Sequence, residues 1–259
     1  MNSFDLPRIE RDADLAAIEF HARIGSTNTR AVELAQRPDL PSPLLVLADE
    51  QFAGRGRGTN QWWAGSGGLT FSLVIRPDAA AFPRRNWPLV SLTTALSVAQ
   101  VLESRVPHAA VRIKWPNDVY VNGRKICGIL VETSGNRAER LILGIGLNVN
   151  NSLSSAPIEL QSIATALIDV AARPFDRTEI LIAVLQRLQQ LLRTLAGETW
   201  PLADAWRQRC YLQGRTVQLD SSGRLTTGVC QGIDDEGALL LLTDGGVQRC
   251  LGGVVSRIL

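Results

Sequence analysis

KWPNDVYVNGRKICGILVE, from Lys114 to Glu132, is the stretch around which a β-sheet of this chain can be assembled. Pro116 ends one apolar run, and Asn122-Gly123 separates two more, which is the strongest short signal of a β-hairpin. Lys125 follows this turn among small and apolar residues, so it is either exposed at a sheet edge or directed into a site. Asp118 offers the oxygen ligands that Mg²⁺ prefers. Taken by itself, the stretch is explained more simply as an ordinary hairpin with common turn residues.

The runs on either side of this hairpin predict further strands and helices. Strands are predicted at Glu19–Ile24, Leu44–Ala48, Leu69–Ile75, Val111–Trp115 and Leu141–Val149. Helices are predicted from Ser26 onward, over Trp87–Leu102, over Thr178–Leu195 and through Trp206. After Tyr211, five short apolar runs separated by Gly and Asp turns predict a small all-β barrel. We therefore predict an α+β fold, with a mixed β-sheet flanked by helices in residues 1–211 and a small C-terminal β-barrel domain in residues 212–259.

The composition is that of a soluble globular protein. Hydrophobic residues make up 45% of the 259 residues, charged residues make up 20%, and the net charge is +2. The bulk charge therefore favours neither nucleic acid nor a membrane surface. The sequence has no apolar run long enough to span a bilayer and no signal peptide. Four cysteines without a Cys-x-x-Cys pair are typical of reduced thiols. We expect a cytoplasmic protein that binds no membrane and no nucleic acid.

A second stretch, AGRGRGTNQWWAGSGGL from Ala53 to Leu69, combines six glycines with two arginines and two tryptophans. We call it the glycine loop. Glycines let backbone N–H groups approach an anion, and Arg55 and Arg57 carry forked donors that match phosphate or carboxylate oxygens. The loop is therefore either an anion site, for which phosphate fits well, or a solvated surface loop. Neither the Walker pattern nor the G-x-G-x-x-G pattern of nucleotide sites fits it.

Other chemistries find little support in the sequence. His21 and His108 are the only histidines, and the H-E-x-x-H pattern of zinc hydrolases is absent. The G-x-S-x-G pattern is absent too, because Ala64 stands where the glycine before Ser66 would be. Zinc-dependent hydrolysis and serine hydrolase chemistry are therefore not expected.

The glycine loop and the hairpin occur in an order and spacing that resemble the biotin protein ligases, also called biotin–[acetyl-CoA-carboxylase] ligases. The resemblance runs from about residue 20 to the end, and its most specific part is Lys-Trp-Pro-Asn-Asp followed by Gly-Arg-Lys. The residues that carry it are Ser26-Thr27-Asn28, Gln51, Gly54-Arg55-Gly56-Arg57, Trp62, Gly67-Gly68-Leu69, Lys114-Trp115-Pro116-Asn117-Asp118, Gly123-Arg124-Lys125, Gly128-Ile129-Leu130, Gly144-Ile145-Gly146-Leu147-Asn148-Val149-Asn150, Gly237-Ala238-Leu239-Leu240 and Gly252-Gly253.

The resemblance implies a catalytic domain like that of class II aminoacyl-tRNA synthetases and a reaction in two steps. ATP and biotin would give biotinyl-5′-AMP and pyrophosphate, and a lysine of a biotin carboxyl carrier protein would then take the biotinyl group. Both reactants of the first step are anions, so cationic side chains and Mg²⁺ on the phosphates suit this chemistry. A loop that closes over the mixed anhydride would keep water away from it.

The resemblance also implies a role for each matching residue. Lys125 and Arg57 would be the catalytic side chains, with Lys125 at the junction of the carboxylate and the phosphate. Trp62 would pack on adenine, and Asp118 would be the metal ligand. The other positions expected to touch biotin or ATP are Ser26, Thr27, Asn28, Gln51, Gly54, Arg55, Gly56, Asn117, Gly128 and Asn148. For Trp63 the resemblance implies no role, and we expect it to serve in packing.

The glycine loop departs from the common pattern of the family. Gly58-Thr59-Asn60 replaces an Arg-Gly-Arg that many members carry, and Ala64-Gly65 replaces a Ser-Pro. Both changes make the loop more flexible, and the first also removes positive charge. We hypothesise that this protein retains biotinyl-AMP more weakly while it keeps its activity.

The start of the chain also differs from that of the bifunctional members. Only 25 residues precede Ser26, which is too few for a DNA-binding helix-turn-helix domain, so a monofunctional ligase is predicted. Two alternatives stay open: a lipoate or octanoate ligase-like acyltransferase of the same fold, and a non-catalytic biotin-binding regulator. A homodimer that forms through a free sheet edge stays open as well.

Overall fold

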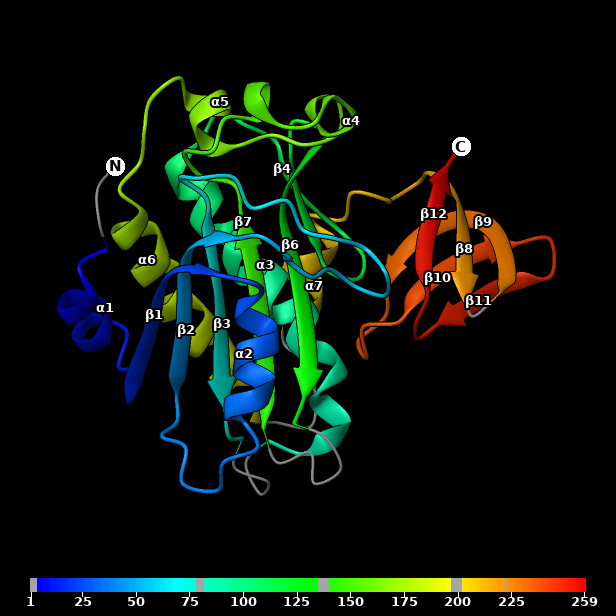
Figure 1. Ribbon diagram of the computed structural model, residues 1–259. Helices are drawn as coiled ribbons and strands as arrows, with labels where there is room; N and C mark the ends of the chain where they lie inside the picture. Colours follow the sequence, from blue (N-terminus) through cyan, green and yellow to red (C-terminus); the bar gives the residue numbers. More distant parts are fainter. Residues whose placement is uncertain (1–3, 78–81, 135–139, 197–201, 222) are drawn as a thin grey trace.

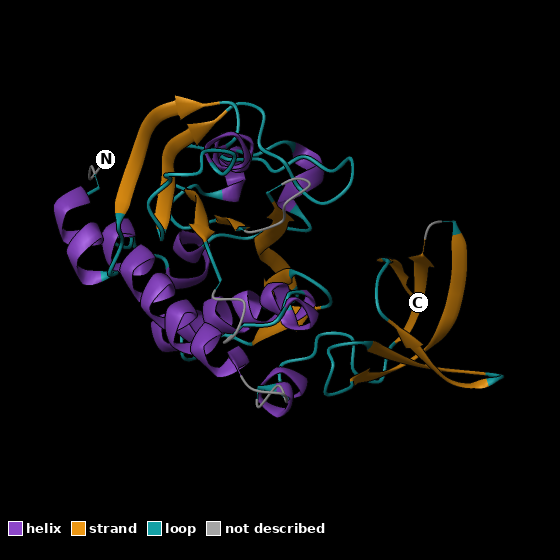
Figure 2. Ribbon diagram, turned by 90° about the horizontal axis from the view of Figure 1, so that it is seen from below, coloured by secondary structure: helices purple, strands orange, loops and turns teal. Residues whose placement is uncertain are grey.

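The computed structural model describes residues 4–77, 82–134, 140–196, 202–221 and 223–259 (Figure 1). Its larger part is a mixed sheet with helices on both faces, and its smaller part is a separate C-terminal sheet. Figure 2 shows the C-terminal strands standing apart from the main body. This is the α+β organisation predicted from the sequence. Within the described ranges, no helix is both long and apolar enough to cross a membrane.

The main sheet has seven strands in the order β1-β2-β3-β7-β6-β5-β4. β1 and β2 run parallel, and all other neighbours are antiparallel. The strands are β1 (Ala17–Ile24), β2 (Leu44–Gln51), β3 (Leu69–Ile75), β4 (Val111–Lys114), β5 (Asp118–Val121), β6 (Arg124–Thr133) and β7 (Leu141–Leu147). The glycine loop connects β2 to β3, so it starts and ends on neighbouring strands. β6 and β7 lie between these strands and the rest of the predicted hairpin.

Helices cover both faces of the main sheet. Figure 1 shows α2 in front of the strands and α3 and α6 behind them. The larger apolar core includes the buried sides of α3 and α6, and a smaller core lies between α2 and the sheet. The helices are α1 (Leu6–Asp12), α2 (Thr27–Leu34), α3 (Pro88–Arg105), α4 (Ile158–Gln161), α5 (Leu167–Ala171), α6 (Arg177–Arg193) and α7 (Ala203–Arg207), with 3₁₀ turns η1 (Arg84–Asn86), η3 (Leu153–Ser155) and η4 (Thr194–Ala196).

The hairpin predicted from the sequence is confirmed. Asn122 and Gly123 have φ angles of 49° and 78°, the left-handed conformation that a tight two-residue hairpin turn requires. β5 pairs with β6 antiparallel on either side of this turn. The other predicted strands and long helices are also present, and β2 extends as far as Gln51. Helices α1, α4 and α5 have no counterpart in the prediction, because they are too short to show helical periodicity.

The predicted C-terminal barrel is wrong, because these strands form an open sheet. The order is β11-β10-β9-β8-β12, with β8 (Thr216–Ser221), β9 (Arg224–Ile233), β10 (Leu239–Thr243), β11 (Gly246–Cys250) and β12 (Val254–Ile258). Among the described residues, β11 and β12 stand at opposite edges and do not pair with each other. Register shifts in β10 and β12 disturb the ladder without closing it. The sequence does not separate the two forms, because apolar residues alternate in a barrel and in an open sheet alike.

Candidate functional site

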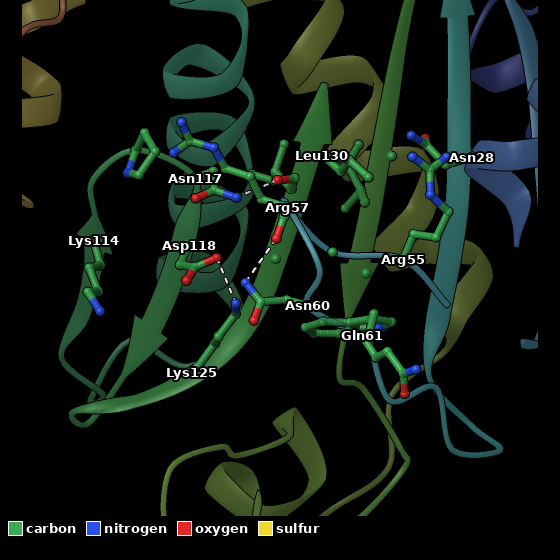
Figure 3. A pocket seen from close by; sticks show the side chains of 18 of the residues that line it. Asn28, Arg55, Arg57, Asn60, Gln61, Lys114, Asn117, Asp118, Lys125 and Leu130 are labelled. Atoms are coloured by element: carbon green, nitrogen blue, oxygen red, sulfur yellow. Dashed lines mark hydrogen bonds and ion pairs between the residues drawn. The ribbon is translucent and has the colours of Figure 1, made fainter. Parts of the chain in front are cut away.

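The glycine loop, the start of α2 and the β5–β6 hairpin surround a cavity over the middle of the main sheet (Figure 3). We call it the first cavity. Of the fourteen predicted site residues, twelve line it: Ser26, Thr27, Asn28, Gln51, Arg55, Gly56, Arg57, Trp62, Asn117, Asp118, Lys125 and Gly128. The fold therefore brings together residues from three separate parts of the sequence.

The start of α2 supplies polar groups to the first cavity. Ser26 caps the helix, because its Oγ accepts a hydrogen bond from the backbone N–H of Thr29 at 3.4 Å. Thr27 donates its backbone N–H to Oε1 of Gln51 at 2.7 Å, and this bond ties the helix to the end of β2. Ser26, Thr27 and Asn28 are all buried, at 5%, 4% and 4% exposure. A ligand that enters the cavity therefore meets polar groups that are largely shielded from water.

Three glycines keep side chains off the part of the sheet that lies under the first cavity. A Cβ atom at Gly144 would lie 2.3 Å from Oδ1 of Asn28, and one at Gly146 would lie 2.3 Å from the Trp62 ring. A Cβ atom at Gly128 would lie 3.2 Å from the same ring. The indole of Trp62 thus rests directly on β6 and β7. Glycine is required at these positions by close neighbours, because a side chain has no room there.

The glycine loop folds back on itself like a short hairpin. The N–H of Gly56 donates to the carbonyl of Asn60 at 2.8 Å, and the N–H of Trp62 donates to the carbonyl of Gly54 at 2.9 Å. Gly58 lies at the turn with a φ angle of 66°, a conformation that favours glycine. A Cβ atom at Gly54 would lie 2.5 Å from the carbonyl oxygen of Trp62, so this glycine lets the two arms approach. The loop therefore holds its arginines and Trp62 in defined positions.

Lys125 and Asp118 form an ion pair in the first cavity, with Nζ 2.8 Å from Oδ1 (Figure 3). The Lys125 ammonium also lies 5.8 Å from the centre of the Trp62 ring, within range of a cation–π contact. Asn117 donates its Nδ2–H to the carbonyl of Ile129 at 2.6 Å, which joins the turn before β5 to β6. Of the two environments that the sequence left open for Lys125, the structure places it inside the site.

Lys114, at the end of β4, adds a second ammonium group to the lining. Burial lowers its pKa from the usual value, the nearby charge of Lys125 lowers it further, and the carboxylate of Asp118 opposes both effects. Because burial is the largest cause, the ammonium lacks solvation by water, and an anion beside it would stabilise its charged form. The first cavity therefore favours a negatively charged ligand at this end.

The two arginines of the glycine loop have different partners. Arg55 makes a two-point ion pair with Glu132, with Nη2 to Oε1 at 2.7 Å and Nη1 to Oε2 at 3.1 Å. Arg57 donates an Nη1–H, at 2.7 Å, to the carbonyl of Gly253, which lies in the turn just before β12 of the C-terminal sheet. Val254, the next residue, also lines the first cavity. The C-terminal sheet therefore contributes directly to the site.

The remaining two predicted residues, Gly54 and Asn148, line a second cavity next to the first. The residues that line both cavities are Gln51, Asn60, Gln61, Trp62, Asp118 and Lys125. The predicted site is therefore one region divided into two compartments that meet at these side chains.

The lining of the second cavity includes a buried polar side chain, Asn148, and an aromatic one, Trp63. Asn148 is buried, where its Nδ2 donates to the carbonyl of Thr165 at 3.0 Å and its Oδ1 accepts from Asn151 at 2.9 Å. Trp63 lines the cavity and packs against a small apolar cluster that includes Leu153. The packing role expected for Trp63 is confirmed, and the same ring faces the cavity.

Three residues that support the site without lining either cavity are absent from the predicted set. Ser72 lies under the start of α2, with its Oγ 2.9 Å from Oγ1 of Thr27. Glu132 and Gly253 hold the two arginines of the glycine loop. Ser72 and Glu132 stand in apolar strands, where a polar residue signals a buried partner, so the sequence did contain a clue to them. The contact of Gly253 has no local signal, because its partner lies 196 positions earlier.

Asp118 is the only carboxylate among the described residues that line either cavity. Mg²⁺ commonly takes one or two carboxylates from a protein when nucleotide phosphates provide other ligands. In the part of the chain that the structure describes, no three His, Cys, Asp or Glu side chains gather to hold a metal by themselves. The lining therefore fits an ion that arrives on a nucleotide. The role of Asp118 as its ligand stays a prediction.

Comparisons with known sequences agree with this site. The "Biotin/lipoate A/B protein ligase family" matches residues 20–150, and the "Biotin protein ligase C terminal domain" matches residues 213–257. The bifunctional ligase/repressor BirA of Bacillus subtilis is 35% identical over 234 residues, which are 89% of this chain and 70% of that protein. The biotin–[acetyl-CoA-carboxylase] ligase of Paracoccus denitrificans is 34% identical over 236 residues, 88% of this chain and 95% of that protein.

A solved structure is similar over nearly the whole chain. The biotin protein ligase from Aquifex aeolicus in complex with biotin and ATP has a TM-score of 0.80 and 30% sequence identity. The match covers 92% of this chain and 97% of that one, so it includes both sheets. This chain therefore belongs to the biotin protein ligase family.

Proposed function

We propose that this protein activates biotin with ATP and transfers it to a lysine of a biotin carboxyl carrier domain. The observation that carries the proposal is the position of Lys125, which lines both cavities beside Asp118. Two anionic reactants held in neighbouring compartments can meet at this ammonium group. The relatives support the proposal, because they are named as biotin ligases and one solved relative holds biotin and ATP.

The first cavity suits biotin. The ureido ring of biotin is neutral and polar, and the start of α2 offers it the hydroxyl groups of Ser26 and Thr27 beside the side-chain amide of Gln51. The indole of Trp62 provides an apolar wall for the rest of the molecule. In this orientation the carboxylate of biotin points toward Lys125.

The second cavity suits ATP, with the adenine near Trp62 and the phosphates toward Lys125. A carboxylate oxygen of biotin then attacks the α-phosphorus, the bond from that phosphorus to pyrophosphate breaks, and biotinyl-5′-AMP forms. Lys125 and Arg57 stabilise the negative charge on the transferring phosphate. When bound, Mg²⁺ neutralises part of the charge of the phosphates, and Asp118 is the side chain that would hold it.

The second step transfers the biotinyl group to the acceptor. The amine of the acceptor lysine attacks the biotinyl carbonyl carbon, the bond to AMP breaks, and AMP leaves. Until the acceptor arrives, the glycine loop covers the adenylate and limits its hydrolysis by water. The Paracoccus relative is named for acetyl-CoA carboxylase, which supports a carboxylase carrier domain as the acceptor.

Biotin-dependent exchange between ATP and pyrophosphate tests the first step with purified protein and Mg²⁺. Transfer to a purified biotin carboxyl carrier domain, detected with avidin, tests the second step. Biotin binding without exchange would contradict the ligase function and favour the regulator, and exchange without transfer would contradict the acceptor. Competition between biotin and lipoate in the same assay separates the ligase from an acyltransferase of the same fold.

Two further properties of the chain stay predictions. We infer from its charge that it binds no operator DNA, and a specific complex in a gel-shift assay would overturn this. β1 forms one edge of the main sheet, where a second copy could pair with it. Sedimentation velocity with and without biotin and ATP measures whether such pairing takes place.

A further inference from the structure

We propose that Glu132 is a positioning residue that gives the two arginines of the glycine loop different tasks. Glu132 holds Arg55 on the main sheet, so that Arg55 anchors the loop. Arg57 is then the loop arginine whose charge meets the anionic ligand. This proposal rests on the biotin ligase function proposed above and concerns the same site.

The ion pair between Arg55 and Glu132 is the first observation. Both terminal nitrogens of the guanidinium contact the carboxylate, at 2.7 Å and 3.1 Å. A two-point contact of this kind fixes the direction of the arginine as well as its distance. Glu132 lies in the last part of β6 and its side chain is 26% exposed, against 43% for Arg55. A regular strand therefore provides the fixed partner, and the loop provides the more exposed one.

The second observation is that Glu132 is itself part of a buried polar series. It accepts a hydrogen bond from Nδ2 of Asn28. Oδ1 of Asn28 lies 2.9 Å from the hydroxyl of Ser72, which is completely buried in β3. Ser72, Asn28, Glu132 and Arg55 thus form a continuous path from the interior of the sheet to the glycine loop. Figure 3 shows Arg55 extended toward Asn28, on the side of the cavity opposite Lys125.

This series also fixes the amide of Asn28. The nitrogen points to Glu132, and the oxygen points to Ser72 and over Gly144, where a Cβ atom would lie only 2.3 Å from it. A change at Glu132 should therefore reach the part of the cavity that we assign to biotin. The same change should have little effect on the second cavity, whose lining does not include Glu132, Asn28 or Arg55.

Arg57 provides the contrast. In the described part of the chain no carboxylate pairs with it, and its partner is the neutral carbonyl of Gly253 at 2.7 Å. Arg55 is balanced by Glu132, and Lys125 is balanced by Asp118. The positive charge of Arg57 is thus left without a balancing carboxylate, and an incoming anion interacts with it more strongly than with Arg55.

Glu132→Gln tests the proposal with little change in shape. The amide keeps one acceptor oxygen but loses the charge that holds Arg55 at two points. We expect the KM for biotin to rise about 10-fold, because a hydrogen-bonded charge pair is lost, while the KM for ATP changes less than about twofold. Calorimetric titration with biotin makes the same comparison without catalysis. An unchanged biotin affinity would overturn the proposal.

A double-mutant cycle then separates the two arginines. In the Glu132→Gln background, Arg55→Ala should raise the biotin KM by less than about twofold further, because its partner is already lost. Arg57→Ala should instead keep its full effect on the dissociation rate of biotinyl-AMP in that background. If the effects of Arg55→Ala and Glu132→Gln multiply fully, the two residues act independently and the proposal is wrong.

Glu103→Gln is the matched control. Glu103 forms a two-point pair with Arg209, at 2.9 Å and 2.8 Å, and neither residue lines a cavity of the site. This change should leave the KM for biotin and the KM for ATP unchanged.

If Glu132→Gln does not fold, Arg55→Gln breaks the same ion pair from the more exposed partner and should raise the biotin KM in the same way. A wild-type protein without exchange contradicts the proposed function, whereas normal exchange in Glu132→Gln with normal biotin binding contradicts the role of Glu132 alone.

Discussion

The floor of the first cavity and the glycine loop across it hold their functional groups in opposite ways. On the floor, formed by the start of α2 with β3, β6 and β7, the side chains of Thr27, Asn28 and Ser72 are buried and bonded to one another. In the glycine loop, Arg55 and Arg57 reach away from their own element, to a carboxylate on the main sheet and a carbonyl just before β12 of the C-terminal sheet.

The difference separates the task of fixing a ligand from the task of enclosing it. Groups on regular elements that support one another keep a site within narrow geometric limits. A loop that admits substrate and releases product needs contacts that break and form again. Changes on the floor should therefore act on binding and chemistry, and so should changes at Arg55, because Glu132 of β6 holds this side chain. Other changes in the glycine loop should act on how long the intermediate stays.

The largest effect is expected at Lys125, where the two compartments meet. Lys125→Ala should reduce biotin-dependent ATP–pyrophosphate exchange by about 100-fold or more, because the charge that stabilises the transferring phosphate is lost. Arg112→Ala removes an exposed cation from β4 outside both cavities and should leave exchange unchanged. If Lys125→Ala keeps more than a tenth of the wild-type exchange rate, Lys125 is not the group at which the biotin carboxylate meets the α-phosphate of ATP.

A matched pair of glycine substitutions compares floor and loop directly. A methyl group at Gly146 would lie 2.3 Å from the Trp62 ring, so Gly146→Ala should displace the ring and weaken biotin binding about 10-fold. At Gly58 nothing lies within 4 Å, so Gly58→Ala costs only the strain of its positive φ angle, about 1 kcal/mol. Titration calorimetry with biotin distinguishes the two. If both variants lose the same amount of biotin affinity, the floor and the loop do not differ in this way.

Restoring charge to the glycine loop should have a moderate effect on retention alone. Asn60→Arg should slow the dissociation of biotinyl-AMP about threefold, since a surface charge pair contributes up to about 1 kcal/mol. Gly58→Arg adds a second charge but must adopt the positive φ angle of 66° or change the turn, so Asn60→Arg is the cleaner test. Stopped-flow release of the preformed adenylate measures both variants. If even the double variant does not slow release, the hypothesis of weak retention is wrong.

The smallest effect is expected for a substitution of Glu19 in β1, which lies outside both the floor and the glycine loop and serves as a baseline. A hydrogen bond from Arg30 lowers the pKa of Glu19, with a smaller contribution from His21 and with burial opposing the shift. Since the folded-state pKa lies below the usual 4.5, the pair stabilises the fold above that pH, and the contribution is lost as the pH falls through the folded value.

Glu19→Gln should therefore lower the free energy of unfolding by about 0.5 kcal/mol at pH 7, because solvent still screens this half-buried pair. Near pH 3 the difference from wild type should shrink. Urea unfolding at both values measures this, and the KM for biotin should stay constant in the variant. A loss of stability that is equal at both values would contradict the assigned role of the carboxylate charge.

The features that the sequence predicts well are those that depend on neighbouring residues. The Asn122-Gly123 turn, the strand that carries Lys125 and the cluster of positive charge in the glycine loop can all be read from neighbouring residues. The contacts that organise the site are distant, since Arg55 and Glu132 are 77 positions apart and their pairing depends on how β6 lies under the loop. The prediction of a C-terminal barrel is wrong for the same reason, because closure of the sheet depends on whether its two edge strands, β11 and β12, pair with each other.

The contact between Arg57 and Gly253 has a consequence for the order in which the protein is made. Synthesis runs from the N-terminus, so the glycine loop and the whole floor leave the ribosome well before Gly253 does. A chain that has been translated only as far as β11 can therefore contain all residues of the floor and of the glycine loop while the partner of Arg57 does not yet exist. Residues that are translated later provide the partner of Arg57, so a change near Gly253 acts on a part of the site that was made earlier.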